Sequence, residues 1–300
     1  MMLLLLGINW CVDLYVSHRL QHSEERMYVG WNDIITTQLN ADLLVMGNSR
    51  AWVMYDSYIL DSILGVNSYN IGIDGSPFNR QIAKYNIYAT FQNKKPQYIV
   101  LNIDHMSMIW REGYEREQFF PYMWYPSFRR EIKKVEPLTI AELYMPLYRY
   151  TTYKGIWDVV MEEPENVADL YKGYAGQERV WDGTAYNKID TVHFEIDNRT
   201  LEMLDAFLSE RQKEGIRILF CYAPIYIGVI GKMDNYSEMR DFYQMLADRY
   251  DIPILDYTYS DISMDTMYFY NATHLNKTGA ELFSIQLAHD LDSIGVKCAK

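Results

Sequence analysis

The chain has 300 residues, of which 49% are apolar, and carries a formal net charge of −12 with a pI near 5.0. This length and composition allow a large buried core, in one large domain or in two. The acidic balance excludes nucleic acid as a partner, because no basic stripe is present to neutralise phosphates. The three cysteines are widely spaced and form no Cys-x-x-Cys pattern, so the sequence indicates neither a zinc site nor a disulfide framework.

The first 22 residues form an apolar lead segment. Asn9 and Asp13 interrupt it, and no Lys or Arg precedes it. A membrane-spanning helix needs about 20 mostly apolar residues, and a signal peptide has a positively charged leader. Two interpretations therefore stay open for this segment: a truncated signal anchor, or an amphipathic first helix that packs on the domain.

A buried strand is predicted over residues 42–46, because a continuous run of Leu and Val is typical of a strand covered on both faces. The strand ends in Gly-Asn-Ser-Arg, which places Ser49 and Arg50 directly after it. In parallel sheets, ligands bind beyond the carboxyl ends of the strands, so Ser49 lies where chemistry is expected. The alternative is an ordinary strand-to-helix turn, in which Gly, Asn and Ser are common.

Two further strands, over residues 68–72 and 97–103, alternate with helical patterns. The helix before the first of them ends at Gly65, a residue that suits a left-handed C-cap. The helix after it begins at Ser76 and Pro77, residues that favour the N-cap and the first turn. This alternation of strand and helix predicts a right-handed, parallel α/β sheet.

The alternation is lost from residue 105 to about residue 195, a stretch rich in Trp, Tyr and Pro. We interpret it as an insertion over the carboxyl edge of the sheet. Its aromatic rings favour either a lid or carbohydrate-binding surface, or a helical subdomain in which the rings form their own core.

Regular elements resume at residue 198. A helix that ends at Gly215, a strand over residues 216–222, a helix from Ser237 and a strand over residues 252–256 complete five strands. Cys221, inside the fourth strand, is predicted to be a core residue. No repeat or linker separates domains. The expected fold is therefore α/β: a three-layer α/β/α, flavodoxin-like fold with a five-stranded, mostly parallel sheet, in a single domain over residues 23–300.

A histidine lies near the end of the chain. Asn271 precedes His274 by three residues, and Thr278 and Glu281 have the spacing of a capping box. Apolar residues then follow at helical intervals: Leu282, Ile285, Ala288 and Leu291. We therefore expect His274 in the loop that leads into the last helix.

A serine after the first strand and a histidine before the last helix is the order found in the SGNH, or GDSL-type, hydrolases and their acyltransferase relatives, which this sequence resembles. The closer likeness is to envelope-anchored bacterial members with Gly-Ser-Ser-Arg at the nucleophile and Asp-x-x-His-Leu-Asn near the C-terminus. The resemblance covers roughly residues 40–104 and 198–294. It implies the SGNH fold, with Ser49 as nucleophile and His274 as base.

The sequence departs from the family at the residue that orients the histidine, because Asn271 replaces an aspartate. An amide oxygen accepts the imidazole N–H but does not stabilise the imidazolium as a carboxylate does, and losing the Asp of a serine triad costs roughly 10⁴-fold in turnover. Three alternatives follow: slow catalysis with Asn271 as the orienting residue, a carboxylate recruited from Asp256, Asp261 or Asp265, or an inactive enzyme.

The resemblance also implies donors for an oxyanion: the backbone N–H of Ser49, the N–H of Gly75 and the side chain of Asn102. The match at Asn102 is loose, because the family's Gly-x-Asn-Asp setting lacks its glycine here, and the alternative is a residue that merely ends the strand. Arg50 and Asp104 are substrate-binding candidates. The alternatives are a structural ion pair for Arg50 and a solvated loop position for Asp104.

No metal or cofactor is expected, since the histidines show no ligand spacing and no Gly-rich phosphate loop is present. The resemblance implies a serine esterase or O-acyltransferase that acts on acyl, chiefly acetyl, esters of an envelope or exported polysaccharide. Its partners would be an acylated carbohydrate and, for a transferase, a membrane acyl-donor protein. Its location would be the cell envelope, outside the cytoplasm, with the N-terminal segment as anchor. The alternative is a catalytically silent SGNH-fold module that binds glycan or an envelope partner through the aromatic insertion.

Overall fold

The computed structural model describes residues 2–151, 155–161, 170–183 and 191–297, and it divides into two compact units. Unit 1 comprises Met1–Leu39, Ala83–Gln92 and Arg111–Ala168, and unit 2 comprises Asn40–Ile82, Asn93–Trp110 and Asp169–Lys300. Helix α5 (Phe78–Phe91) begins in unit 2 and ends in unit 1.

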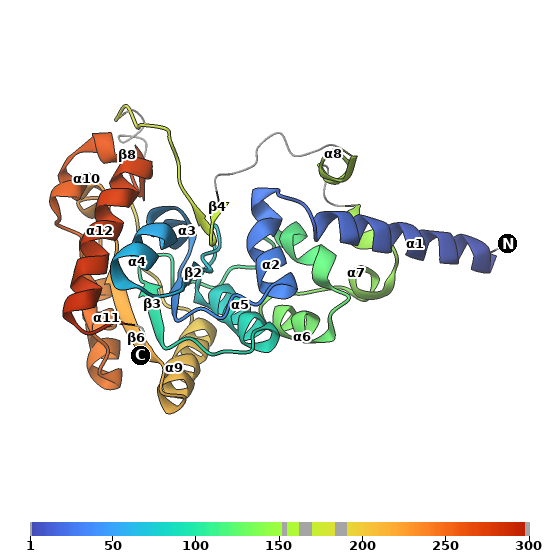
Figure 1. The fold of residues 1–300 in the computed structure, drawn as a ribbon, viewed down its shortest axis with the longest axis horizontal. Coiled ribbons are helices and arrows are strands. Elements are labelled where there is room, and N and C mark those ends of the chain that lie inside the picture. The colour runs from blue at the N-terminus through green and yellow to red at the C-terminus, as the bar shows by residue number, and fades with distance from the viewer. Residues whose placement is uncertain (1, 152–154, 162–169, 184–190, 298–300) are drawn as a thin grey trace. The chain divides into compact units, whose positions relative to one another are not determined.

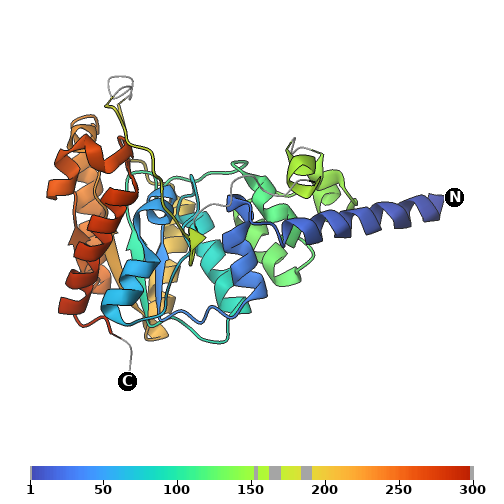
Figure 2. The ribbon, with the colours of Figure 1, turned by 45° about the horizontal axis from the view of Figure 1, so that its top comes forward.

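Unit 2 is built on a five-stranded sheet in the order β2-β1-β3-β6-β7. The strands are β1 (Leu43–Met46), β2 (Ser68–Asn70), β3 (Tyr98–Asn102), β6 (Arg217–Tyr222) and β7 (Ile254–Asp256). Each neighbouring pair is parallel, and Figure 2 shows the strands side by side. These strands are the apolar runs of the sequence, so the predicted five-stranded sheet is confirmed, and it is parallel throughout.

The remaining elements of unit 2 are helices, short 3₁₀ helices and two small hairpins. The helices are α3 (Ser49–Met54), α4 (Ser57–Leu64), α9 (Asn198–Lys213), α10 (Ile227–Ile230), α11 (Tyr236–Tyr250) and α12 (Lys277–Ser293), with the 3₁₀ helices η4 (Asp261–Met264) and η5 (Thr266–Tyr268). The hairpins are β4 (Leu170–Tyr171) with β5 (Tyr174–Ala175), and β8 (Phe269–Asn271) with β9 (His274–Leu275).

Helices cover both faces of the sheet (Figure 1). Successive strand residues point to opposite faces. Val45 and Val100 pack in one core with residues of α3, α4 and α12. On the other face, α9 packs on β6, and the ring of Phe220 lies 6.3 Å from that of Tyr243 in α11. The predicted three-layer α/β/α fold class is confirmed. Cys221 is fully buried as predicted, and burial raises the pKa of its thiol to about 12.

Two helix ends test the capping predictions. Gly65 ends α4 in the left-handed conformation at φ +65°, as its sequence position predicts. The predicted capping box at Thr278 is wrong, because α12 begins earlier and is capped by Asn276, whose Oδ1 accepts a hydrogen bond from Gly279 N at 3.0 Å. Asn276, and not Thr278, caps the helix because its short amide side chain reaches the free N–H groups of the first turn.

Of the four apolar residues that mark α12 in the sequence, Ala288 and Leu291 are buried and Leu282 and Ile285 are exposed. Phe283, Leu287 and Leu291 are fully buried, whereas Leu282 and Ile285 are 42% and 40% exposed. Both sets of residues have helical spacing, so spacing alone does not decide which of two adjacent stripes meets the core.

Unit 1 is helical in its described residues. Its elements are α1 (Met2–Leu20), α2 (Arg26–Thr36), η1 (Arg116–Tyr122), α6 (Pro126–Val135), α7 (Ile140–Tyr144), η2 (Tyr148–Tyr150) and α8 (Ile156–Met161). The buried ring of Trp31 packs edge-on against Phe119 at 5.7 Å and Phe128 at 5.3 Å. Phe119 and Phe128 of the aromatic stretch are core residues, as the helical-subdomain interpretation expects, but they share this core with Trp31 of α2, which lies outside the stretch. The predicted domain boundaries stay a prediction.

Helix α1 is the apolar lead segment. Its second half packs within unit 1: Val16 and Leu20 are buried, and the buried Asp13 pairs with Arg149 and accepts a hydrogen bond from Leu147 N at 2.6 Å. None of the helices in the described ranges is long and apolar enough to cross a membrane.

Lys84 is buried in unit 1, with its ammonium group 4.7 Å from the centre of the Trp31 ring. Burial lowers its pKa from 10.5 to about 7. Because the lysine of the unfolded chain keeps its ordinary pKa, the unfolded state binds more protons between these two values, and stability rises with pH across that window.

We therefore expect Lys84→Met to raise the free energy of unfolding at pH 6 by on the order of a few kcal/mol, and expect this gain to shrink towards pH 10. Urea unfolding of both proteins at the two pH values measures the effect. Lys133→Met, at an exposed position of α6, is the matched control and should change stability little at either pH. A gain for Lys84→Met that does not depend on pH would contradict the prediction.

Candidate active site

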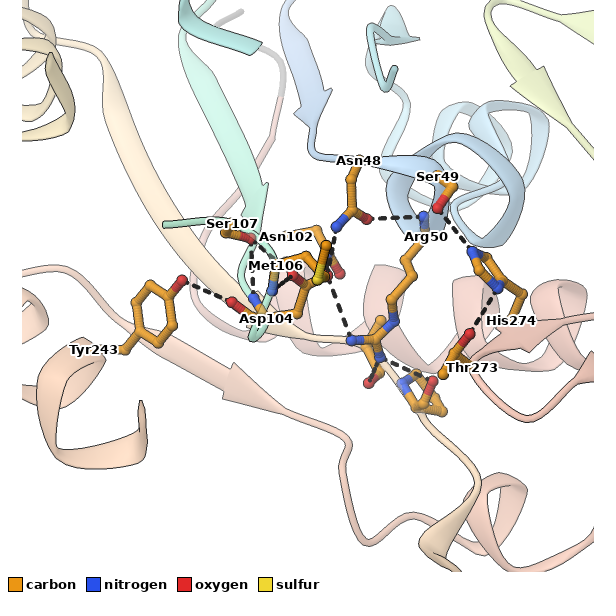
Figure 3. A network of polar contacts seen from close by, with 12 residues as sticks. Asn48, Ser49, Arg50, Asn102, Asp104, Met106, Ser107, Tyr243, Thr273 and His274 are labelled. Atoms are coloured by element: carbon orange, nitrogen blue, oxygen red, sulfur yellow. Dashed lines mark hydrogen bonds and ion pairs between the residues drawn. The ribbon is translucent and has the colours of Figure 1, made fainter. Parts of the chain in front are cut away.

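The structure brings Ser49, His274 and Asn271 into one hydrogen-bonded row in unit 2. The Oγ of Ser49 lies 2.8 Å from Nε2 of His274, and Nδ1 of the same ring lies 2.9 Å from Oδ1 of Asn271. Figure 3 shows the serine and the histidine facing each other from α3 and β9. All three side chains are partly exposed, so a reactant can approach them from solvent.

The direction of these hydrogen bonds follows from a backbone donor. The N–H of Thr273 donates to Asn271 Oδ1 at 3.0 Å, so the oxygen of that amide faces the histidine. An amide oxygen only accepts, and Nδ1 must therefore carry the ring proton. This leaves the lone pair of Nε2 directed at Ser49 Oγ, which is the tautomer that a general base needs.

Ser49 is held at the first turn of α3 by a sharp strand-to-helix connection. Asn48 is the N-cap, and its Oδ1 accepts from Arg50 N at 3.0 Å. Gly47 leaves room for this turn, since a Cβ there would lie 2.5 Å from Ala51 Cβ and 2.8 Å from Asn102 Cβ. A larger residue at position 47 would push α3, and Ser49 with it, away from the sheet.

His274 is held by the β8–β9 hairpin and by a stacked ring. Asn271 pairs with His274 across the hairpin, and the ring of Tyr270 stacks on the imidazole at 5.3 Å with an angle of 26° between the planes. The guanidinium of Arg179 lies 5.2 Å from the centre of the Tyr270 ring. The side chain of Asn276, the α12 cap, donates to Met267 O of η5 at 2.7 Å and to Phe269 O of β8 at 3.4 Å, and so ties the hairpin to the helix.

Thr273 is a site residue that the sequence reasoning missed. Its Oγ1 lies 2.9 Å from His274 Nδ1 and donates to Asn271 Oδ1 at 3.2 Å. The ring N–H of His274 therefore meets two oxygens, and three donors converge on Asn271 Oδ1. The only signal in the sequence is a hydroxyl residue next to the histidine, and it does not say which way the side chain points.

The three predicted oxyanion donors differ in what the structure shows of them. The N–H of Ser49 belongs to the first turn of α3, where helix geometry supplies no partner. Gly75 lies in a turn at φ +54°, just after Ile73, whose N–H bonds to Gly47 O at 3.0 Å beside the nucleophile turn. Asn102 is fully buried, with its oxygen accepting from Tyr55 at 2.9 Å. The oxyanion roles stay predictions.

Arg50 is a buried residue in an ion pair. Its Nη2 donates to Ala223 O at 2.6 Å and to Pro224 O at 3.1 Å, and its Nη1 lies 3.7 Å from Asp104 Oδ2. These contacts agree with the alternative in which Arg50 forms a structural ion pair. Its role in substrate binding stays a prediction.

The expectation of a solvated loop position for Asp104 is wrong, because this carboxylate is 2% exposed. It accepts from Asn48 Nδ2 at 2.7 Å, from Met106 N at 2.9 Å and from Ser107 Oγ at 3.0 Å (Figure 3). Burial alone would raise its pKa, but Arg50 and these donors outweigh burial, and the pKa lies below its ordinary value. Asp104 thus fixes Asn48, the cap that positions Ser49, and its predicted contact with substrate stays a prediction.

The carboxylates proposed as replacements for the missing aspartate have other surroundings. Asp256 pairs with Arg240 at 2.6 Å, and Asp265 caps η5 by accepting from Met267 N at 2.9 Å. Asp261 is exposed at the start of η4. Nδ1 of His274 already has its acceptors, so the arrangement favours Asn271 as the orienting residue. Within the described ranges, no cluster of three or more His, Cys, Asp or Glu side chains could hold a metal ion.

No protein-family model matches the sequence, and no curated protein matches it significantly. Among solved structures, a protein described as lipolytic and of the G-D-S-L family from Desulfitobacterium hafniense is 11% identical, with 82% of this chain and 97% of that chain covered and a TM-score of 0.44. A GDSL-like lipase from Bacteroides thetaiotaomicron is 10% identical, with coverages of 83% and 87% and a TM-score of 0.39. A catalytic mutant of an acetylxylan esterase from Geobacillus stearothermophilus is 10% identical, with coverages of 89% and 100% and a TM-score of 0.42. The function proposed below rests on the side chains of the site.

Proposed function

We propose that this chain is a serine esterase or O-acyltransferase of the SGNH type, acting on acyl esters of a polysaccharide. The observation that carries the proposal is the row from Ser49 through His274 to Asn271, with both ring nitrogens at hydrogen-bond distance from their partners. A serine hydroxyl is a weak nucleophile at neutral pH, and a positioned imidazole is what makes it reactive.

The geometry suits acyl transfer in two steps. In the first, Ser49 Oγ attacks the ester carbonyl while His274 Nε2 takes the hydroxyl proton, and the same nitrogen then returns the proton to the departing sugar oxygen. In the second, water or a sugar hydroxyl attacks the acyl-serine, again with His274 as base. The N–H of Ser49, in the first turn of α3, is the proposed backbone donor to the developing oxyanion charge.

The acyl group proposed is chiefly acetyl, and the proposed setting is the cell envelope outside the cytoplasm, with an acylated carbohydrate as substrate. If a sugar hydroxyl replaces water as the acceptor, a membrane protein would supply the acyl group. The exclusion of water from the acyl-serine decides between hydrolase and transferase.

A second candidate function is a catalytically silent module that binds glycan or an envelope partner. Two observations favour it: an amide takes the place of the orienting carboxylate, and the Asn102 side chain is enclosed with Tyr55 and Asp104 as partners at 2.9 Å and 3.3 Å. Both features reduce transition-state stabilisation without disturbing the fold.

Labelling with a fluorophosphonate probe tests the proposed function without knowledge of the natural substrate. We expect the probe to modify Ser49, with the site located by mass spectrometry, because the probe reacts only with an activated hydroxyl. His274→Ala removes the base and should abolish labelling, and Ser49→Ala should remove the modified residue itself. Losing one member of such a pair costs up to about 10⁶-fold in rate.

Ser263 provides the control, because it is a buried serine of η4 in the same unit. Ser263→Ala should label like the parent protein. If a folded parent protein leaves Ser49 unlabelled, the catalytic proposal loses its basis, and the silent module becomes the better account.

A further inference from the structure

A small cavity lies in unit 2 beside the ion pair of Arg50 and Asp104. Its walls come from α3, from residues at or just beyond the ends of β3, β6 and β7, and from α10, α11 and the turn between these two helices. A water molecule can place its centre within a volume of about 20 Å³ there, which is room for a group about the size of one or two water molecules. Ser49 and His274 are not among the residues that line it, so the cavity is a site apart from the reacting pair.

Two buried donors on the wall of the cavity have no hydrogen-bond partner among the described residues. The guanidinium of Arg50 uses Nη2 on two backbone carbonyls just beyond β6 and Nη1 on Asp104, and its Nε–H is left over. The hydroxyl of Tyr222 is the second donor, and it keeps its proton because burial raises its pKa. Arg50 is 6% exposed and Tyr222 is 4% exposed. Buried donors are normally paired, so these two indicate a ligand that brings an acceptor oxygen.

The charges around the cavity favour a neutral acceptor over an anion. Arg50 is balanced by Asp104, and the nearby Arg240 is balanced by Asp256. Burial lowers the pKa of His105, so this ring adds little positive charge at neutral pH. A carboxylate or a phosphate would therefore be an unbalanced charge next to the buried carboxylate of Asp104, which is costly.

The rest of the wall is largely apolar. It is formed by the side chains of Ala223, Ile225, Ile230, Met233 and Met239. Three of the lining residues are partly exposed, namely His105, Ile230 and Tyr236, so the cavity opens to solvent on their side. The ligand group that suits these walls is small, has an acceptor oxygen and an apolar part, and is attached to something that stays outside.

We propose that this cavity binds the acetamido group of an N-acetylated sugar in the polysaccharide. The carbonyl oxygen of the group accepts from Arg50 Nε–H and from the Tyr222 hydroxyl, and its methyl group lies against the Ile and Met side chains. The sugar ring stays outside, at His105 and Tyr236, because the cavity is too small to hold it. An amide oxygen is neutral and accepts well, which meets both the donors and the charge balance. The proposal rests on the proposed function in one respect, that the ligand is a glycan.

Saturation-transfer NMR with the parent protein and N,N′,N″-triacetylchitotriose tests the proposal, because it reports which protons of the ligand touch the protein. We expect the acetyl methyl protons to be saturated more strongly than the ring protons. Cellotriose has the same linkage and no acetamido groups, and we expect it to bind at least about tenfold more weakly, since it leaves the two buried donors unpaired.

Tyr222→Phe removes one donor and keeps the ring. We expect it to raise the dissociation constant for triacetylchitotriose by about tenfold, because one hydrogen bond to the carbonyl is lost. Tyr250→Phe is the matched control: the hydroxyl of Tyr250 bonds to Asp205, outside the cavity, and this variant should bind like the parent. Circular dichroism confirms that both variants keep the fold.

Four results would overturn the proposal. Equal binding of the two trisaccharides would mean that the acetamido group is not recognised, and Tyr222→Phe that binds like the parent would place the ligand elsewhere. Sodium acetate that displaces triacetylchitotriose at an equal concentration would assign the cavity to an anion. If neither trisaccharide binds, the cavity holds water only.

Failure of the proposed function is a separate result. Ser49→Ala should bind triacetylchitotriose like the parent, because Ser49 does not line the cavity. A protein that is labelled at Ser49 but does not bind the trisaccharide keeps the proposed chemistry and loses only this assignment of the cavity. A protein that binds the trisaccharide but is not labelled keeps the assignment and supports the silent module.

Discussion

Asn271→Asp is expected to raise the esterase rate of this chain, by up to about 10⁴-fold in kcat/KM on a small chromogenic acetyl ester. A carboxylate in place of the amide would accept the same hydrogen bond from His274 Nδ1, now 2.9 Å long, and would stabilise the imidazolium that forms when Ser49 attacks. The measurement is kcat/KM for the parent, Asn271→Asp and Asn271→Ala. We expect the order Asp, Asn, Ala from fastest to slowest.

The surroundings of Asn271 explain why the substitution should be accepted. The Thr273 N–H, the Thr273 hydroxyl and the His274 ring N–H all point at the same oxygen of Asn271, at 3.0, 3.2 and 2.9 Å. Three donors around one oxygen suit a carboxylate better than an amide, because the carboxylate carries a full negative charge and more acceptor sites.

The double variant Asn271→Asp/His274→Ala is the control, and it should lose the whole gain if the carboxylate acts through the imidazole. An Asn271→Asp protein that is folded but no faster than Asn271→Ala would argue against an assembled catalytic site. That result, combined with an unlabelled Ser49, would support the silent binding module.

Asp104→Asn is expected to lower the free energy of unfolding by about 3–5 kcal/mol, the range found when one partner of a buried ion pair is removed. The carboxylate is 2% exposed, and its substitution leaves the 6% exposed Arg50 without its negative partner. In the parent, Asn48 Nδ2 donates to Asp104 Oδ2 at 2.7 Å. In the variant, the amide at position 104 would offer this donor either a nitrogen, which does not accept, or an oxygen that accepts more weakly than a carboxylate. Urea unfolding at neutral pH measures the loss.

The pH dependence of this effect has a definite sign. The pKa of Asp104 is lowered from 3.8 in the folded protein, so its stabilisation is present above that value and is lost as the pH falls through the folded-state pKa. The difference between the parent and Asp104→Asn should therefore be equal at pH 7 and pH 5 and should shrink only in stronger acid.

Asp241→Asn is the matched control, because Asp241 is exposed on α11 of the same unit, and it should change stability by less than about 0.5 kcal/mol. A double-mutant cycle with Arg50→Met isolates the pair itself. If Asp104→Asn is as mild as Asp241→Asn, the buried pair does not stabilise the fold.

The sequence predicts the strands and helices of unit 2 well because these elements depend on local signals. Continuous apolar runs specify strands covered on both faces, and Gly65 specifies a helix end by its backbone freedom alone. Ser49 is predictable for a related reason, since it follows a strand of a parallel sheet, where ligands bind, whereas His274 was predicted from its place before the last helix and from the order of serine and histidine in the family that the sequence resembles.

Features that depend on side-chain direction or on distant contacts were not predictable. The cap of α12 required a choice between Asn276 and Thr278, two good capping residues that lie two positions apart. The burial of Asp104 depends on Arg50, 54 positions earlier, and on the way both residues reach the same buried network. The core of unit 1 joins Trp31 to Phe119 and Phe128, a pairing that no local pattern contains.

The separation of Ser49 and His274 along the chain has a consequence for biosynthesis. The two residues are 225 positions apart, and His274 lies on a hairpin that Asn276, the cap of α12, ties to the start of that helix. During synthesis, Ser49 therefore emerges from the ribosome long before His274, the residue that activates it. A nascent chain that has folded its first strands holds an unreactive hydroxyl, and the reactive pair is completed only when the last helix has emerged and packed.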